Sequence, residues 1–275
     1  MRVDTPKTDM NQSTHVEKQY ASDSGLATRI AMHQKYSTNK QGFANWLAGQ
    51  YQYAKGCKIL ELGCGNAAFW QSRLDTLPDG TLLVLSDFSA GMLEAARESI
   101  GDAPNVLMQK INIQDIPFVD ESFDIAIANH MLHHVPDIPL AMAEVRRVLK
   151  PGGVFYCSAN GKNGVSGWLH HTLKSFNPAI DKYGEGEPFS LQNGRDFLAP
   201  YFGTVALAQY GDSLEITQTQ DLVDYIKSAT TMMDIGEEQL EGLFDFLETI
   251  RVREGAIRIP KESGLFISTK KSLAP

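Results

Sequence analysis

The sequence predicts an α/β protein built on a doubly wound, mostly parallel sheet. Three observations support this prediction. Between Lys58 and Ser158, short apolar runs alternate with stretches of helical periodicity, the first run ends at glycines, and the second ends at an aspartate. Such alternation is typical of parallel strands joined by helical crossovers. Ligands of these sheets lie at the carboxyl ends of the strands, where the winding reverses.

Five short apolar runs are the expected strands: 58–62, 81–86, 106–111, 123–128 and 154–158. The fourth is apolar enough to suit burial on both faces. Ser89 can cap a helix that runs through Met92. A second helix is expected over residues 138–149, and it must end there because Pro151 disfavours helical geometry at the residue before it.

Two regions lie outside this alternation. Residues 16–55 have an amphipathic, helical pattern. Residues 160–212 are irregular and rich in Gly, Asn, Pro and aromatic side chains, which is typical of a lid or a substrate pocket. The aromatic residues of the second region are Trp168, Phe176, Tyr183, Phe189 and Phe197. We therefore expect four segments: an N-terminal helical cap (1–55), a core (56–160), a substrate or lid insertion (161–212) and a C-terminal completion of the sheet (213–275).

Composition and charge narrow the function. The chain has 275 residues, 43% of them hydrophobic, and a net charge of −8 without any long basic cluster, so a nucleic-acid partner is not expected. No apolar run is long enough to span a bilayer, and the first twenty residues lack a secretory signal. Three cysteines without metal-ligand spacing favour a reducing, cytoplasmic setting over a disulfide framework.

The first strand leads into Gly63 and Gly65, and a helix is expected to follow. Glycine allows a tight turn and close approach to a ligand, and a helix N-terminus favours electron-rich groups. Asp87, at the end of the second strand, can accept hydrogen bonds from both hydroxyls of a ribose. Taken alone, the glycines are also consistent with a plain turn, and Asp87 with a residue that caps the helix near Ser89.

Four motifs together resemble the class I methyltransferases. Residues 59–65 look like the first motif of that family and 86–93 like its acidic second motif; 116–124 and 147–153 are similar to the lead-ins to its fourth and fifth strands. The resemblance implies a Rossmann-like methyltransferase fold with seven strands, the last antiparallel. It also implies S-adenosyl-L-methionine as the cofactor and S-adenosyl-L-homocysteine as the product. A nicotinamide dehydrogenase shares the glycine turn but not the last two motifs.

The resemblance also assigns binding residues. The implied cofactor contacts are Glu61, Gly63, Cys64, Gly65, Asp87, Phe88, Met92, Asn112, Ile113, Asn129, His130, Tyr20 and Tyr36. Glu61 would help to hold the amino end, Asp87 the ribose hydroxyls, and Phe88 would pack on the adenine. Asn112 stands where the family usually has an aspartate that receives the adenine amino group, and Asn129 would lie beside the methyl-bearing sulfur.

Two further features depend on the resemblance. The third glycine of the first motif is replaced by Ala67, which fits if its backbone stays in an ordinary helical region. The two additional strands are expected from 214–217 or 257–259, and from 265–268.

Methyl transfer is an in-line displacement in which the placement of the nucleophile matters most, and a base is needed only for a protonated acceptor. His130, His133 and His134 are the candidates because imidazole titrates near neutral pH. The resemblance favours a different interpretation, because His-His followed by Val135 is frequent in the family as a structural end to the fourth strand. No metal site is expected from these histidines and the second pair, His170 and His171, because no carboxylate lies at ligand spacing beside either pair.

The sequence therefore predicts an S-adenosylmethionine-dependent methyltransferase that acts on a small molecule. A protein or RNA methyltransferase, and a cofactor-binding protein without methyl transfer, stay open as alternatives.

Overall fold

The computed structural model describes residues 23–180, 188–229 and 236–271. The chain forms two compact units assembled from segments that alternate along the sequence. The first unit comprises 1–38, 167–185 and 213–260, and the second comprises 39–166, 186–212 and 261–275. The domain boundaries at 55, 160 and 212 stay a prediction.

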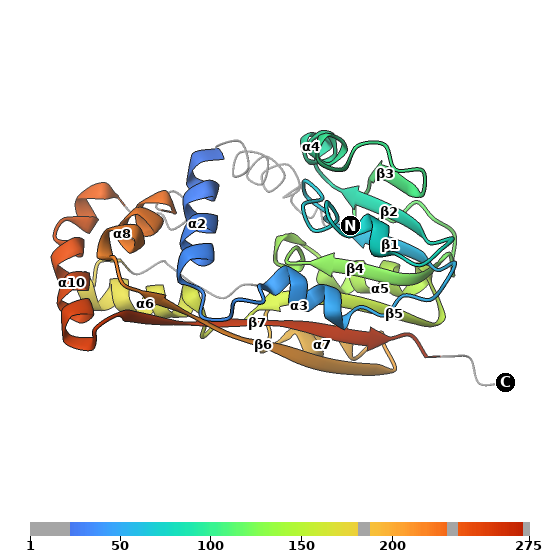
Figure 1. Ribbon diagram of the computed structural model, residues 1–275. Coiled ribbons are helices and arrows are strands. Elements are labelled where there is room, and N and C mark those ends of the chain that lie inside the picture. The colour runs from blue at the N-terminus through green and yellow to red at the C-terminus, as the bar shows by residue number, and fades with distance from the viewer. Residues whose placement is uncertain (1–22, 181–187, 230–235, 272–275) are drawn as a thin grey trace, which may run out of the picture. The chain divides into compact units, whose positions relative to one another are not determined.

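A seven-stranded sheet organises the second unit, with the strand order β3-β2-β1-β4-β5-β7-β6. The strands are β1 (Lys58–Leu62), β2 (Leu82–Asp87), β3 (Val106–Lys110), β4 (Phe123–Asn129), β5 (Leu149–Asn160), β6 (Thr204–Ile216) and β7 (Ile257–Thr269). The first five are parallel, and β7 runs antiparallel to β5. The predicted doubly wound, mostly parallel sheet is confirmed, and the winding reverses between β1 and β4 (Figure 1).

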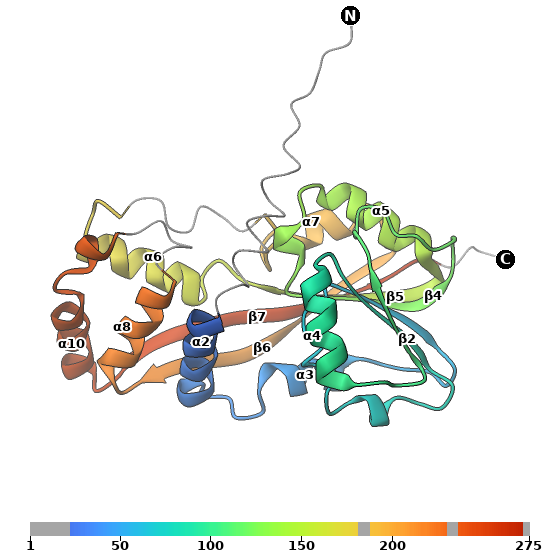
Figure 2. The same ribbon diagram turned by 90° about the horizontal axis from the view of Figure 1, so that it is seen from above.

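Helices cover both faces of this sheet, as the two apolar clusters show. Alternate residues of β1 point to opposite faces. Leu60 packs in a cluster with Val145 of α5 (Ile138–Val148), whereas Ile59 packs in another with Ala96 of α4 (Ala90–Ile100). Figure 2 shows both helices beside the sheet from above. As predicted, Ser89 caps α4 by accepting a hydrogen bond from the Met92 N–H.

The segment after the glycine turn differs from the prediction. No α-helix opens at Gly65; residues 65–73 form successive turns, and a short 3-10 helix, η1 (Leu74–Thr76), follows. Ala67 has φ of 56°, so the expectation of an ordinary helical backbone there was wrong. The Ala67 N–H donates to Cys64 O and the Ala67 carbonyl accepts from Trp70 N, and these two bonds hold the left-handed turn.

The last two strands are longer than predicted. The runs 257–259 and 265–268 belong to one strand, β7, because the polar residues between them continue its extended backbone. The run 214–217 overlaps the end of β6, which begins at Thr204, inside the segment expected to be irregular. The described part of that segment also holds α6 (Val165–Phe176) and α7 (Gly194–Leu198).

In the first unit, α2 (Asp23–Tyr36) packs on α8 (Thr219–Ser228). The Arg29 guanidinium donates to Ser228 O at 2.9 Å, and the Lys35 ammonium pairs with Asp221 at 2.7 Å. This unit also contains η3 (Glu237–Leu240) and α10 (Leu243–Glu254). Gly242, which lies between them, has φ of 79°. The expected N-terminal helices are thus present as α2 and α3 (Phe43–Gln50), the latter in the second unit.

Candidate active site

The glycine turn lies at the carboxyl end of β1, and its two glycines differ in what lies beside them. Both have positive φ, 74° at Gly63 and 55° at Gly65, a conformation that side chains rarely adopt. A Cβ at Gly63 would come within 2.9 Å of the Met131 side chain, whereas a Cβ at Gly65 would meet no atom within 4 Å. Gly63 is therefore covered by the protein, and the space beside Gly65 is open to a ligand.

Asp87 ends β2 next to this turn. One carboxylate oxygen accepts the Gly65 N–H at 2.9 Å and the other accepts the Ser89 N–H at 2.9 Å. A carboxylate offers about four lone-pair sites, so each oxygen keeps capacity for another donor. This arrangement fits a ligand that presents two adjacent hydroxyls.

An exposed aromatic ring follows Asp87. Phe88 has 49% of its surface exposed, and the Lys110 ammonium lies 5.4 Å from the centre of its ring. Lys110 is paired with Asp87 in the β2–β3 register. The ring offers a face on which a planar group can stack.

The predicted adenine contacts adjoin the end of β3. The Asn112 side-chain oxygen accepts the Gln114 N–H at 2.9 Å, and Asn112 also forms an isolated bridge with Asp115. That oxygen keeps one lone pair for an amino group, as the prediction requires. Ile113 is buried in the apolar cluster below.

Glu61 is buried beneath the turn. Its carboxylate accepts hydrogen bonds from the Trp70 indole N–H and from the Asn129 amide, the latter at 3.2 Å. Burial raises the pKa of Glu61 to about 7, against the lowering effect of these donors. The structure therefore places a carboxyl group that titrates near neutral pH at the carboxyl ends of β1 and β4.

Several residues that hydrogen-bond to Asn129 or to Glu61 were not predicted from the sequence. The Tyr51 hydroxyl donates to the Asn129 side-chain oxygen at 2.8 Å, and the Ser158 hydroxyl donates to the same atom at 3.3 Å. Trp70 is fully buried beside Glu61. The parallel register that pairs Asn129 with Ser158 is the one signal that could have identified a partner, once β4 and β5 were aligned.

The histidines follow β4. His130 has φ of 49°, a conformation uncommon outside glycine, and its Nδ1 is buried without a hydrogen-bond partner among the described residues. Its ring lies 5.0 Å from that of Phe43. Burial lowers the pKa of His130 to about 4, so its imidazole is neutral at physiological pH.

His133 and His134 form the short 3-10 helix η2 (Leu132–His134), with ring centres 4.0 Å apart. Burial, then the neighbouring His134, lowers the pKa of His133 to about 3, and burial also lowers that of His134. Both imidazoles are therefore neutral near pH 7.

The predicted site residues do not all gather at this edge. Glu61, Gly63, Cys64, Gly65, Asp87 and Asn129 come together at the carboxyl ends of β1, β2 and β4. Tyr20 lies outside the described residues. Tyr36 belongs to the first unit, where its hydroxyl donates to Asp221 of α8.

The aromatic residues of 160–212 contribute to packing. Phe189 is buried in the core of the second unit, with its ring centre 5.8 Å from that of Phe266. Phe176 contacts Phe246 within the first unit at 5.4 Å. Phe189 is therefore a core residue, whereas Phe176 is half-buried. Tyr183 lies outside the described residues.

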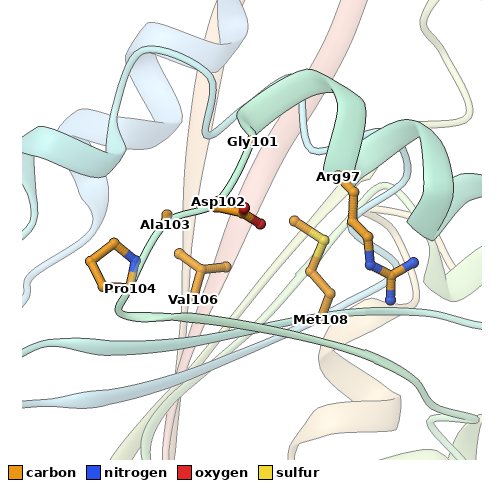
Figure 3. A pocket seen from close by; sticks show the side chains of 7 residues that line it. All are labelled: Arg97, Gly101, Asp102, Ala103, Pro104, Val106 and Met108. Carbon is orange, nitrogen blue, oxygen red and sulfur yellow. The ribbon is translucent and has the colours of Figure 1, made fainter.

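A separate hollow of about 340 Å³ lies between the end of α4 and the start of β3 (Figure 3). Its lining residues are Arg97, Gly101, Asp102, Ala103, Pro104, Val106 and Met108. It opens toward the amino end of β3, whereas Asp87 and the glycine turn lie at carboxyl ends. The hollow is therefore not part of the candidate site.

Two features, a metal-binding cluster and a membrane-spanning helix, are absent from the residues that the structure describes. Within 23–180, 188–229 and 236–271, no three His, Cys, Asp or Glu side chains gather as a metal ion would require. In the same ranges, no helix has both the length and the apolar character needed to cross a membrane.

Comparison with known proteins shows what this edge of the sheet resembles. Residues 60–157 match the family described as "Methyltransferase domain". The matched stretch contains Glu61, the glycine turn, Asp87 and the histidines, and it ends within β5.

Curated relatives are similar to this chain over part of its length. The demethylmenaquinone methyltransferase of Staphylococcus carnosus is 36% identical over 154 residues, which is 55% of each chain. The chain spans about half the length of the curated relatives that it matches first.

Two solved structures share the fold of this chain. The YcgJ protein of Bacillus subtilis is 17% identical with a TM-score of 0.57, covering 84% of this chain and 98% of that one. Phosphoethanolamine N-methyltransferase 2 of Haemonchus contortus, crystallised with S-adenosyl-L-methionine, is 16% identical with a TM-score of 0.58, covering 98% of this chain and 62% of that one.

Proposed function

We propose that this chain is an S-adenosylmethionine-dependent methyltransferase that acts on a small-molecule acceptor. The observation that carries the proposal is the pairing of Asp87 with the open glycine turn, inside a stretch that matches the methyltransferase domain family. When bound, the cofactor supplies an electrophilic methyl group on a sulfonium.

The cofactor-facing residues have distinct tasks. Asp87 binds the two ribose hydroxyls through the lone pairs that Gly65 and Ser89 leave available. Phe88 provides a stacking face for the adenine, and Asn112 accepts from its amino group. Glu61 supplies negative charge near the amino end, and Cys64 and Met92 line the turn and the start of α4.

The acceptor side is formed by the residues after β4. Among the three histidines we assign the role of contacting the acceptor to His130, because its Nδ1 is buried without a partner among the described residues and its backbone is held in a positive-φ conformation. A neutral imidazole with a lowered pKa accepts a hydrogen bond well but is a weak base. His130 therefore positions an acceptor hydroxyl or amine, and the in-line approach provides most of the rate enhancement.

A small acceptor is supported by the relatives named demethylmenaquinone methyltransferase and by the acidic composition. A cytoplasmic setting is supported by three free cysteines: Cys57, Cys64 and Cys157. Transfer of label from isotopically labelled cofactor to a metabolite panel that includes demethylmenaquinone tests the acceptor class. A peptide or RNA acceptor that outcompetes every small molecule in the panel would overturn this part of the proposal.

The cofactor site is tested by calorimetry with S-adenosylmethionine. We expect Asp87→Ala to weaken binding at least tenfold, because both ribose contacts are lost and each charge-assisted hydrogen bond contributes about 1.5–3 kcal/mol. Ser89→Ala is the matched control, since it removes the helix cap of α4 but leaves the Asp87 carboxylate in place. Unchanged affinity in Asp87→Ala contradicts the assignment of the ribose site.

A further inference from the structure

The amide of Asn129 connects three segments of the chain that no motif links. Its oxygen accepts from the hydroxyls of Tyr51, just after α3, and Ser158, in β5, while its NH₂ group donates to Glu61 in β1. All four residues belong to the second unit. The connections therefore do not depend on where the two units lie.

The orientation of this amide is determined by its partners. The Ser158 oxygen already accepts the His130 backbone N–H at 3.1 Å, so its own proton is available to donate to Asn129. Tyr51 donates to the same oxygen at the shorter distance of 2.8 Å. With two donors on its oxygen, the Asn129 amide must present its N–H groups to Glu61.

This orientation matters because of the charge on Glu61. If the amide were reversed, its oxygen would face a carboxylate oxygen, and two acceptors would oppose each other. A protonated Glu61 tolerates that reversal, because it can donate, whereas an ionised Glu61 does not. The amide orientation and the protonation of Glu61 are therefore coupled.

We infer that the Tyr51 hydroxyl, acting through the Asn129 amide, keeps the Glu61 carboxylate hydrogen-bonded and ionised as the counter-charge for the cationic amino end of the cofactor. Tyr51 is thus a positioning residue that does not itself contact the ligand. The inference rests on the proposed function, because it assumes that the ligand carries positive charge.

The titratable groups around Glu61 agree with this role. Tyr51 and Tyr53 come from the segment before β1, Cys64 from the turn, and Asp87 from β2. Burial, then the charge of Glu61, raises the pKa of Tyr51 well above its usual value, so Tyr51 keeps the proton that it donates. Asp87 raises the pKa of Glu61 further, and a bound cation would oppose both effects.

The first test uses the protein without cofactor. Trp70 donates to Glu61, so its fluorescence emission reports the protonation of that group. Emission is recorded from pH 5.5 to 8.5 for the native protein, for Tyr51→Phe and for Tyr53→Phe, with Glu61→Gln to identify the transition due to Glu61. We expect Tyr51→Phe to raise the midpoint by about half to one pH unit, since one hydrogen bond that fixes the amide is lost. Tyr53→Phe removes a nearby phenol for which no bond to Asn129 is observed, and it should leave the midpoint unchanged.

The second test measures S-adenosylmethionine binding by calorimetry over the same pH range. Tyr51→Phe should weaken binding about fivefold at pH 7, and the difference should shrink at pH 8.5, where Glu61 is ionised in both proteins. A merely structural role for Tyr51 would weaken binding equally at every pH.

Two results would overturn the inference. Equal midpoints for Tyr51→Phe and the native protein, with normal cofactor binding, contradict the role of Tyr51 and leave the proposed function intact. Absence of binding by the native protein at every pH from 5.5 to 8.5 contradicts the proposed function itself, and the inference that rests on it.

Discussion

Neighbouring strands β1 and β2 both end at a carboxylate, and the two ends are built in opposite ways. Glu61 is buried and held by side chains from distant parts of the sequence, with the turn above it covered by Met131. Asp87 is half-buried and held by backbone N–H groups, next to open space at Gly65 and the exposed Phe88 ring. The end of β2 can therefore offer carboxylate lone pairs directly to a ligand, while the end of β1 offers the charge of a buried carboxylate.

The largest effect on stability is expected at the carboxyl end of β1, the closed end, where Met131 covers Gly63. Gly63→Ala places a methyl group against Met131 in a left-handed backbone, so we expect a loss of about 2–4 kcal/mol of unfolding free energy. Gly65→Ala has the same backbone strain but open space, and should lose only about 1–2 kcal/mol. Urea unfolding followed by circular dichroism measures both. Equal losses would show that Met131 does not close this end.

A smaller, pH-dependent effect is expected from Glu61. Its pKa is about 7 in the folded chain and near 4.5 when unfolded, so the folded state binds more protons between these values. Stability contributed by the protonated group is present below about pH 4.5 and is lost as the pH rises toward 7, by up to about 3 kcal/mol. Glu61→Gln should abolish this loss.

Urea unfolding at pH 5 and pH 8 tests that expectation. Asp79→Asn, which neutralises a carboxylate with 89% of its side chain exposed, is the matched control and should keep the native pH dependence. If Glu61→Gln also keeps the native dependence, Glu61 is not the group that titrates, and the contrast with Asp87 fails.

The smallest effect on stability is expected at the carboxyl end of β2, the open end, where Phe88 is exposed. Phe88→Ala should change the unfolding free energy by no more than about 0.5 kcal/mol, because the ring is exposed. It should weaken S-adenosylmethionine binding about 3- to 10-fold through the lost stacking contact. Leu107→Ala removes a side chain of similar exposure on β3 and should leave calorimetric affinity unchanged. Equal affinities for the two variants would remove Phe88 from the site.

The open end could be predicted from the sequence because its parts are contiguous. Asp87, Phe88 and the Ser89 cap follow one another, and each acts through local backbone geometry. The glycine turn was predicted for the same reason. Local pattern did not predict Ala67 correctly, because the direction of that turn depends on the hydrogen bonds it makes with Cys64 and Trp70.

The closed end could not be predicted from local pattern. Tyr51 and Ser158 reach Asn129 from segments 78 and 29 residues away. The strand register brings Ser158 there, and the tertiary placement of the segment after α3 brings Tyr51. Trp70 resembles an ordinary core residue until its indole N–H is seen to donate to Glu61. Neutral histidines were likewise not predicted, because burial, which lowers their pKa values, is a property of the folded chain.

Hydrogen–deuterium exchange with and without S-adenosylmethionine directly tests whether the cofactor binds at the carboxyl ends of β1 and β2. We expect slower exchange of backbone amides at the glycine turn and at residues 87–93, because the ligand lies against both strand ends. Amides that line the hollow between Arg97 and Met108 should be unchanged. Protection confined to that hollow, or no protection anywhere in 60–157, would contradict the assignment of the cofactor site.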